Sequence, residues 1–261
     1  MMRFLAGRLS NGGAARPLGQ GRPRLATPEF PAVIYAVGDV HGRLDLLKRL
    51  EEKIATDAVT ISGQALIVML GDYIDRGPSS AQTLAHLISP MADGLRRICL
   101  CGNHEQAMFE ALDDAESFSW WLRFGGSETL ASYGISEDAV RARWEVVQNV
   151  LADYIPIEHI SFLAGLPVML RVPGYVFAHA GLRPGVAIED QTDHDLCWIR
   201  DLFLESGFDF GATVVHGHTI APSVHVSKRR IGLDLGAFAS GRLAAVRLMQ
   251  GRSPKIMEIQ L

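Results

Sequence analysis

The chain has 261 residues, of which 48% are hydrophobic, and carries a formal net charge of −4 with a pI of about 6.1. This length and composition predict a full hydrophobic core in one domain, or one domain with a small insertion. The lack of a broad basic charge argues against a nucleic-acid partner, and no apolar run reaches the roughly 18 residues that cross a bilayer.

Residues 1–31 differ in composition from the rest of the chain. They contain five arginines, many Gly and Pro residues, and a single acidic residue, Glu29. Because such a segment can bury little apolar surface, we interpret it as a flexible N-terminal tail. An acid-poor start with arginines also occurs in organelle transit peptides, but the glycines and prolines weaken any amphipathic helix. The folded domain is therefore expected to span residues 32–261.

Three strand–loop–helix units follow. The apolar run 32–37 predicts a strand that ends at Gly38, and leucines at helical spacing predict a helix to about residue 57. Residues 65–70 predict a second strand before the loop 71–77, and a helix follows Pro78. Residues 97–101 predict a third strand, followed by a loop at 102–105 and a helix. This alternation indicates a mostly parallel sheet with its ligand at the carboxyl ends of the strands.

The second half of the chain has a different pattern. From about residue 113 to 159 no strand is evident, and we predict a helical insertion that packs over or beside the site, with its aromatic residues as its core. Short strand-like segments follow at 168–172, 175–178, 213–215, 224–226, 231–233, 243–248 and 256–259. Turns at residues 173–174, 228–229 and 240–241 predict antiparallel hairpins. We therefore expect an α/β fold of two mixed sheets, packed as a sandwich and flanked by helices.

Polar residues beside glycine end five of the predicted strands. These residues are Asp39, His41, Asp72, Asp75, Asn103, His104, His179, His216 and His218. Carboxylate, amide and imidazole ligands together suit divalent ions such as Mn, Fe or Zn. They are too many for one ion with an open position, so two ions about 3.5–4 Å apart that share a carboxylate fit better.

The three cysteines provide no second metal site. Cys99 and Cys101 have C-x-C spacing, but the chain has no second cysteine pair, so a zinc site is not expected there. With Cys197 the cysteines are odd in number and lie in apolar segments. This usage disfavours disulfides and predicts a reducing, cytoplasmic location.

Five motifs in this order resemble the phosphoprotein phosphatase family of calcineurin-like metallophosphoesterases, in its bacterial and phage serine/threonine phosphatase branch. They are Gly-Asp-x-His-Gly at 38–42, Gly-Asp-Tyr-x-Asp-Arg-Gly at 71–77, Gly-Asn-His-Glu at 102–105, His-Ala-Gly at 179–181 and Gly-His-Thr at 217–219. The resemblance covers about residues 32–250. It implies a four-layer metallophosphoesterase-like fold and a metal-dependent phosphatase whose substrates are phosphoproteins or phosphorylated small molecules.

The resemblance also implies residue roles. The first of two divalent ions, for which Mn is the first candidate, would take Asp39, His41 and Asp72. The second would share Asp72 and add Asn103, His179 and His218. A hydroxide between the ions would attack phosphorus, and His104, oriented by Asp75, would protonate the leaving oxygen. Arg76, Arg200 and Asn103 would hold the phosphoryl oxygens.

The sequence leaves two alternatives open. Symmetrical diadenosine tetraphosphatases are close relatives of this branch, but they usually lack an acid at the position of Asp75, which favours a serine/threonine phosphatase here. A metal-binding scaffold without turnover is disfavoured, because every ligand and the acid pair are present. Cys101 stands where bacterial relatives often have arginine, which removes one expected phosphate contact. We interpret His216 as structural rather than as a ligand.

Overall fold

The computed structural model describes residues 21–91 and 94–261, and within them two mixed sheets form the centre of the fold. The first sheet has the spatial order β11 (Lys255–Gln260), β10 (Arg242–Leu248), β2 (Val33–Val37), β3 (Ala65–Met69) and β4 (Leu95–Cys99). The second has the order β1 (Arg24–Ala26), β5 (Met169–Val172), β6 (Tyr175–Ala178), β7 (Thr213–His216), β9 (Arg230–Gly232) and β8 (His225–Val226). The predicted two-sheet α/β architecture is confirmed.

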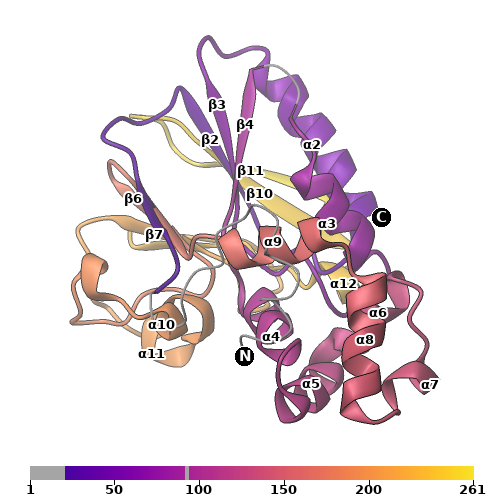
Figure 1. Cartoon of the computed structure of the whole chain (residues 1–261). Coiled ribbons are helices and arrows are strands. Elements are labelled where there is room, and N and C mark those ends of the chain that lie inside the picture. The colour runs from indigo at the N-terminus through magenta and orange to yellow at the C-terminus, as the bar shows by residue number, and fades with distance from the viewer. Residues whose placement is uncertain (1–20, 92–93) are drawn as a thin grey trace.

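Side chains along β2 alternate between the two faces of the first sheet, and each face packs into a separate hydrophobic core. Val33, Tyr35 and Val37 belong to a core shared with helix α2 (Leu44–Ala58), whereas Ile34 and Ala36 belong to the core between the two sheets. Both faces of the strand are therefore buried, as expected for a sheet covered on both sides. Figure 1 shows α2 and α3 (Ser80–Ile88) on one side of this sheet and β6 and β7 on the other.

Parallel pairing brings the functional loops to one place. β2, β3 and β4 are parallel neighbours, with Val37 opposite Met69 and Met69 opposite Cys99. β6 and β7 are likewise parallel neighbours in the second sheet. The loops that follow these five strands hold all the predicted ligand residues, because the carboxyl ends of parallel strands lie at the same sheet edge.

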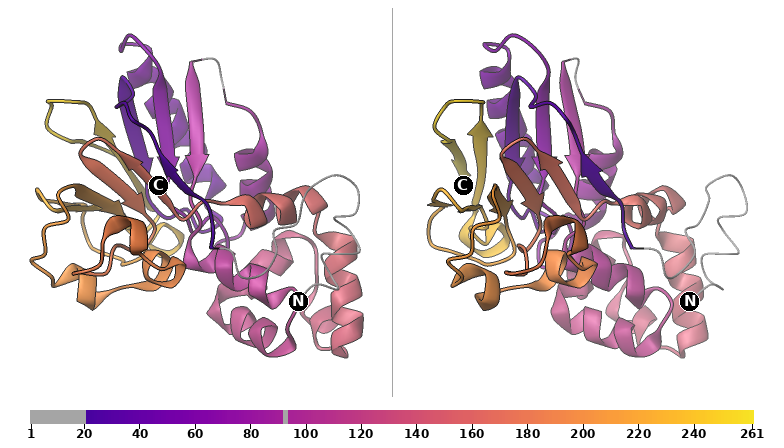
Figure 2. Two further views of the ribbon diagram at one scale, coloured as in Figure 1. Left: turned by 60° about the vertical axis from the view of Figure 1, so that its left-hand side comes forward. Right: turned by 90° about the vertical axis from the view of Figure 1, so that its left-hand side faces the viewer.

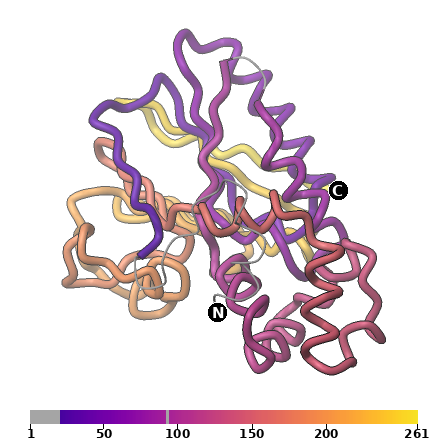
Figure 3. Tube along the Cα trace, in the orientation of Figure 1, coloured from indigo at the N-terminus to yellow at the C-terminus, as the bar shows by residue number. Residues whose placement is uncertain are grey.

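The last part of the chain returns to the first sheet. β10 pairs antiparallel with β2, and β11 pairs with β10. In Figure 3 the yellow end of the chain runs beside the first purple strands. The predicted hairpins at residues 173–174 and 228–229 are present. The one at 240–241 is wrong: Ser240 ends the short helix α12 (Ala237–Ser240), and β9 and β10 lie in different sheets.

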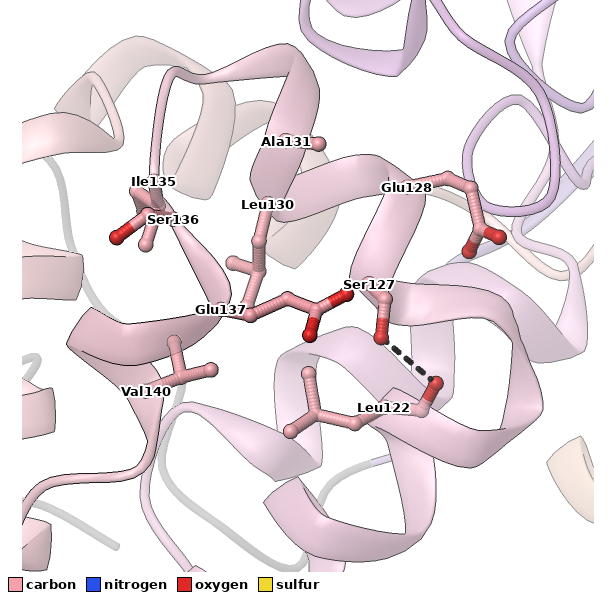
Figure 4. Close-up of a pocket in the computed structure, with 9 residues that line it drawn as sticks. All are labelled: Leu122, Ser127, Glu128, Leu130, Ala131, Ile135, Ser136, Glu137 and Val140. Atoms are coloured by element: carbon pink, nitrogen blue, oxygen red, sulfur yellow. Dashed lines mark hydrogen bonds between the residues drawn. The ribbon is translucent and has the colours of Figure 1, made fainter.

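The predicted insertion is helical. Residues 113–159 hold α5 (Ala115–Trp121), the π-helical turn η2 (Leu122–Gly126), α6 (Ser127–Ser132), α7 (Glu137–Val140), α8 (Trp144–Tyr154) and the start of α9 (Ile157–Gly165). Figures 1 and 2 show α5 to α8 grouped at one corner, beside α4 (Asn103–Ala111), and Figure 1 shows α9 nearer the centre of the molecule. A cavity of about 260 Å³ lies among η2, α6 and α7, and its lining includes the buried Leu130 and Ile135 and the exposed Glu128 and Glu137 (Figure 4).

The predicted tail is too long. β1 lies inside residues 1–31 and pairs in parallel with β5, with Leu25 opposite Leu170. Arg24 fixes this segment further, since its Nη2 donates to Asp193 Oδ1 at 2.7 Å and to the carbonyl oxygen of Gln191. Sheet pairing thus orders a segment whose composition predicted no structure; residues 1–20 lie outside the described part of the chain.

Two further boundaries differ from the prediction. β4 runs from Leu95 to Cys99, two residues earlier than expected, because an edge strand tolerates exposed side chains such as Arg96. α4 begins at Asn103, so the Asn-His-Glu sequence forms its first turn rather than a loop. No helix of the described residues is long and apolar enough to cross a membrane.

Candidate metal centre

The loops at the strand ends hold unusual backbone conformations. Among the described residues, the only non-glycine residues with positive φ are His41, Asp72, Asp75, Arg76 and His218, with values from 43° to 69°. All five are predicted site residues. L-residues adopt this left-handed region at a cost of about 1–2 kcal/mol each, so the surrounding structure must hold these loops in place.

Two glycines allow the loops to approach one another closely. A Cβ atom at Gly102 would overlap the carboxylate and the backbone nitrogen of Asp72. A Cβ atom at Gly217 would overlap the carboxylate of Asp39. Glycine is therefore required beside both carboxylates, and this explains its place before Asn103 and His218.

Two groups of buried side chains share Asp72. The ligand atoms of His41, Asp72 and His104 lie within 4.8 Å of one another, and so do those of Asp72, His179 and His218. His41 Nε2 is 3.5 Å from Asp72 Oδ2, and His179 Nε2 is 3.4 Å from Asp72 Oδ1. The two oxygens of one carboxylate thus face two different sets of imidazoles.

Asn103 and Asp39 complete the surroundings of Asp72. Asn103 Oδ1 lies 2.8 Å from both His179 Nε2 and His218 Nδ1. Asp39 belongs to neither three-residue group, but its Oδ2 accepts a hydrogen bond from the backbone nitrogen of His218 at 3.0 Å. All six predicted metal ligands are therefore gathered here, and His104 lies as near to Asp72 as a ligand would.

The donor atoms fit divalent ions. Within the described residues, Asp39 Oδ1, His104 Nε2 and His218 Nε2 are buried and have no hydrogen-bond partner. Such atoms are costly to bury unless something binds them. His41 Nδ1 and His179 Nδ1 contact the carbonyl oxygens of Ile74 and Leu70, at 2.8 and 3.0 Å, which aims each Nε2 at Asp72.

Electrostatics support the same conclusion. Burial lowers the pKa of His41 to about 3 and that of His218 to about 2, so both imidazoles are neutral and can donate a lone pair. Burial raises the pKa of Asp39, and repulsion from Asp234 and Asp72 raises it further. Burial alone would raise the pKa of Asp72, but the histidines around it, His179 first, lower it. A cation would relieve this crowding of carboxylates.

A second interaction links His104 to Asp75. His104 Nδ1 lies 2.7 Å from Asp75 Oδ2, and both side chains are fully buried. The Asp75 carboxylate also accepts hydrogen bonds from Trp121 Nε1 at 2.9 Å and from Thr129 Oγ1 at 2.6 Å. The pair therefore depends on the insertion, which supplies both of these donors.

Glu105 holds two of the loops together. Its carboxylate accepts hydrogen bonds from the backbone nitrogens of Asp72, Tyr73 and Gly102, at 2.7–2.9 Å. Burial raises the pKa of Glu105, and Asp72 raises it further. A single fully buried side chain thus connects the loop after β3 to the loop after β4.

The two predicted arginines have different surroundings. The Arg76 guanidinium lies between two rings, 5.0 Å from Phe238 and 5.7 Å from Phe124. Arg200 is exposed. Burial lowers the pKa values of His179 and His218, and the positive charge of Arg200 contributes to the same direction. Cys101 is fully buried and faces away from solvent, so it cannot take the place of a phosphate-binding arginine.

The model of the calcineurin-like phosphoesterase family matches residues 32–241. The chain belongs to this family. It is 28% identical over 226 residues to a serine/threonine-protein phosphatase 1 from Salmonella typhimurium, which covers 82% of this chain and 91% of that protein. It is also 28% identical over 156 residues to a symmetrical bis(5'-nucleosyl)-tetraphosphatase from Aromatoleum aromaticum, covering 60% of this chain and 46% of that protein.

The solved structures agree on the fold. A structure described as a candidate diadenosine tetraphosphatase has a TM-score of 0.63 at 20% identity, and the match covers 91% of this chain and 97% of that one. The solved structure confirms the metallophosphoesterase fold, and the family match confirms a hydrolase of phosphate esters. Both are implied by the five motifs.

Several residues of this metallophosphoesterase site were missed by the sequence analysis. Glu105 is part of the Gly-Asn-His-Glu motif, but nothing in that motif indicates that its carboxylate binds backbone nitrogens. Trp121 and Thr129 could not be found, because only folding brings the insertion to Asp75. His216 is among the buried residues with an unpartnered nitrogen, Nε2, yet its Nδ1 lies 3.0 Å from the carbonyl oxygen of Gly217 and it joins neither ligand group.

Proposed function

We propose that this protein is a phosphomonoesterase that acts on phosphoserine and phosphothreonine in proteins. One observation carries the proposal: His104 has one nitrogen bound to Asp75 at 2.7 Å, while the other is unpartnered, buried and 3.9 Å from Asp72 Oδ2. An imidazole held in this way can give a proton to a leaving oxygen beside the ligand cluster. This geometry matches general-acid catalysis of phosphate-ester hydrolysis.

We assign the ligand cluster to two divalent ions, with Mn as the first candidate. Asp39, His41 and Asp72 would hold one ion, and Asp72, Asn103, His179 and His218 would hold the other. Bound there, the ions supply positive charge for the phosphoryl group and a nucleophile at neutral pH. Iron and zinc suit the same mixture of oxygen and nitrogen ligands.

The remaining roles belong to residues at the edge of the cluster. His104 protonates the leaving oxygen, and Asp75 fixes the ring so that its other nitrogen faces the substrate. Arg76 and Arg200 bind phosphoryl oxygens, because a planar guanidinium matches their geometry. The two phenyl rings that flank the Arg76 guanidinium limit its rotation.

Two observations support a phosphoprotein substrate: how much of each relative's length this chain matches, and the presence of Asp75. The similarity to the Salmonella phosphatase spans 91% of that protein, whereas the similarity to the tetraphosphatase spans 46%. The acid at position 75 is the feature that symmetrical tetraphosphatases usually lack. The three free cysteines, all buried, support a reducing cytoplasmic location.

The second candidate substrate is a dinucleoside polyphosphate such as diadenosine tetraphosphate. It is favoured by the structural similarity to a candidate diadenosine tetraphosphatase over 91% of this chain. The same ligand cluster and the same acid could serve this reaction.

The deciding experiment compares kcat/KM for a phosphothreonine peptide and for diadenosine tetraphosphate, with Mn-loaded protein at one pH. We expect the peptide to be preferred. A preference for the dinucleotide would overturn the choice of substrate but not the assignment of the ligand cluster. Turnover of neither substrate, with metal bound, would overturn the proposed function.

A further inference from the structure

Three aromatic rings form a connected cluster that begins at His104. Phe124 stacks on the His104 ring, with centroids 4.1 Å apart and planes at 8°. Trp120 stacks on Phe124 at 4.5 Å and 23°, and Trp198 lies 5.8 Å from Phe124. We call Trp120, Phe124 and Trp198 the aromatic wall. It runs from His104 to the second ligand group, because Trp198 is 6.5 Å from His218.

The wall is assembled from separate parts of the chain. Trp120 is on α5, Phe124 is in η2, and Trp198 ends α10 (Asp193–Trp198). Trp198 is fixed by a hydrogen bond from its Nε1 to Gln106 Oε1 at 2.8 Å. A π-helical turn inside a helical segment is rare and often marks a functional site. Here the turn brings Phe124 onto His104.

Trp120 differs from its neighbour Trp121. Trp121 is fully buried and bound to Asp75, whereas 42% of Trp120 is exposed although one of its faces stacks on Phe124. The Trp120 and Trp198 rings are 6.0 Å apart and inclined at 48°, so they form an open angle rather than a closed stack. The aromatic residues of the insertion were predicted to form its core, and for the exposed Trp120 this is wrong.

We propose that the aromatic wall is a subsite for a planar aromatic group on the leaving-group side of the substrate. This inference rests on the proposed function, since His104 marks that side only if it protonates the leaving oxygen. The group attached to that oxygen must then extend past Phe124, whose neighbours are the two indoles. Stacking on one exposed indole should raise affinity roughly 5- to 100-fold.

Two kinds of substrate can supply a planar aromatic group near the phosphoryl group. One is an aromatic side chain next to the phosphorylated residue of a peptide, and the other is the base of a nucleotide. Both present a planar π-face at a short distance from the phosphoryl group. The wall therefore selects by ring stacking, and the experiment must separate the two sources.

The first measurement is binding without turnover. The affinities of phenylphosphonate and methylphosphonate for Mn-loaded protein are compared by calorimetry, in the wild type and in Trp120→Ala, Trp120→Phe and Tyr154→Ala. We expect phenylphosphonate to bind roughly 5- to 100-fold more tightly in the wild type. Trp120→Ala should remove this preference and Trp120→Phe should retain most of it. Tyr154 is an exposed aromatic residue on α8, so its replacement should change nothing.

The second measurement identifies the source. Values of kcat/KM are taken for phosphothreonine peptides with tyrosine or alanine beside the phosphorylated residue, and for diadenosine tetraphosphate against inorganic tetraphosphate. If Trp120→Ala lowers kcat/KM only for the tyrosine peptide, the wall binds an aromatic side chain of a peptide. If it lowers kcat/KM only for the dinucleotide, the wall binds a nucleotide base. Equal losses for every substrate would overturn the proposal, because Trp120 would then only support Phe124 and His104.

The two proposals can fail separately. Equal affinity of the wild type for the two phosphonates overturns the aromatic subsite, whatever the turnover. A preference for phenylphosphonate without turnover of any substrate retains the aromatic wall as a binding site, but it overturns the proposed function and with it the assignment to the leaving group. Binding of neither phosphonate overturns both.

Discussion

His104 has two ring nitrogens in different surroundings. Nδ1 is held by Asp75 at 2.7 Å, and Nε2 is buried without a partner beside Asp72. The ring is also fixed by Phe124, which stacks on one of its faces. A side chain with this degree of restraint has little freedom to lose when a substrate binds, as a proton donor in an active site requires.

Replacement of His104 by alanine should slow turnover of an alkyl phosphate about 10²- to 10⁴-fold, because a poor leaving group needs its proton. The loss should be smaller for p-nitrophenyl phosphate, whose leaving group needs little protonation. Steady-state rates on both substrates provide the check, with metal content measured in the same samples. Equal losses on the two substrates would contradict the general-acid role.

Asp72 faces both ligand groups with one carboxylate. Asp72→Asn removes the negative charge and replaces one acceptor oxygen by a donor, so both groups lose a shared ligand. We expect metal content, measured by atomic emission on dialysed protein, to fall at both positions. Full occupancy of two ions in this variant would exclude Asp72 as the bridge. His216→Ala, which lies outside both groups, is the matched control.

At the level of elements, the insertion is part of the site rather than an addition to it. Trp121 and Thr129 hold the Asp75 carboxylate, and the Gly125 carbonyl oxygen accepts a hydrogen bond from the Arg76 backbone nitrogen at 3.1 Å. The insertion thus contacts both the His104–Asp75 pair and Arg76, the arginine that we propose binds phosphate. Variation in these helices is expected to change catalysis, not only substrate choice.

Trp121→Phe tests this control. It keeps the ring in the core but removes one hydrogen bond to a charged carboxylate, which is worth about 1.5–3 kcal/mol. We expect kcat for an alkyl phosphate to fall about 10- to 100-fold, with metal content unchanged. Phe118→Leu, a change at a buried neighbour on the same helix that contacts Trp121 but not Asp75, should have a much smaller effect.

Strands and helices could be predicted where apolar residues recur at a regular spacing or where a loop has glycine at both ends. The strands at residues 33–37 and 65–69 read as uninterrupted apolar runs because both of their faces are buried. The six proposed ligands could be named because each lies in one of the five motifs that carry the family resemblance. β1 was missed because three residues beside Arg22 and Pro23 have no pattern, and their order comes from a partner strand far along the chain. The hydrogen bond from Trp121 to Asp75 could not be predicted for the same reason, because folding alone brings these two distant residues together.

Across the whole molecule, one carboxylate joins the first and last parts of the chain. Asp57, in the last turn of α2, accepts hydrogen bonds from Tyr35 on β2, Arg247 on β10 and Lys255 on β11. Burial would raise the pKa of Asp57, but these three donors outweigh it and lower the value below 3.8. The helix and three strands are therefore tied by one ionised group.

Acid should weaken this connection. Because the pKa of Asp57 is lower in the folded state than in the unfolded one, its contribution is complete above the unfolded value and is lost as the pH falls through the folded value. We expect the free energy of unfolding, measured by urea denaturation, to fall between about pH 5 and 2. Asp57→Asn should lower stability at pH 7 and make this fall shallower. An unchanged slope in the variant would contradict the role of Asp57.

The left-handed backbone at His41, Asp72, Asp75, Arg76 and His218 has a consequence for how this protein can evolve. Together these residues oppose folding by roughly 5–10 kcal/mol, a sizeable part of the 5–15 kcal/mol that keeps an ordinary domain folded. Glycine at any of them would relieve strain and remove a side chain to which we assign a role in the site. A descendant released from selection for activity should therefore drift toward glycine or asparagine at these five positions first, and become more heat-resistant as it does so. Inactive descendants of this protein should therefore have a higher melting temperature than active ones.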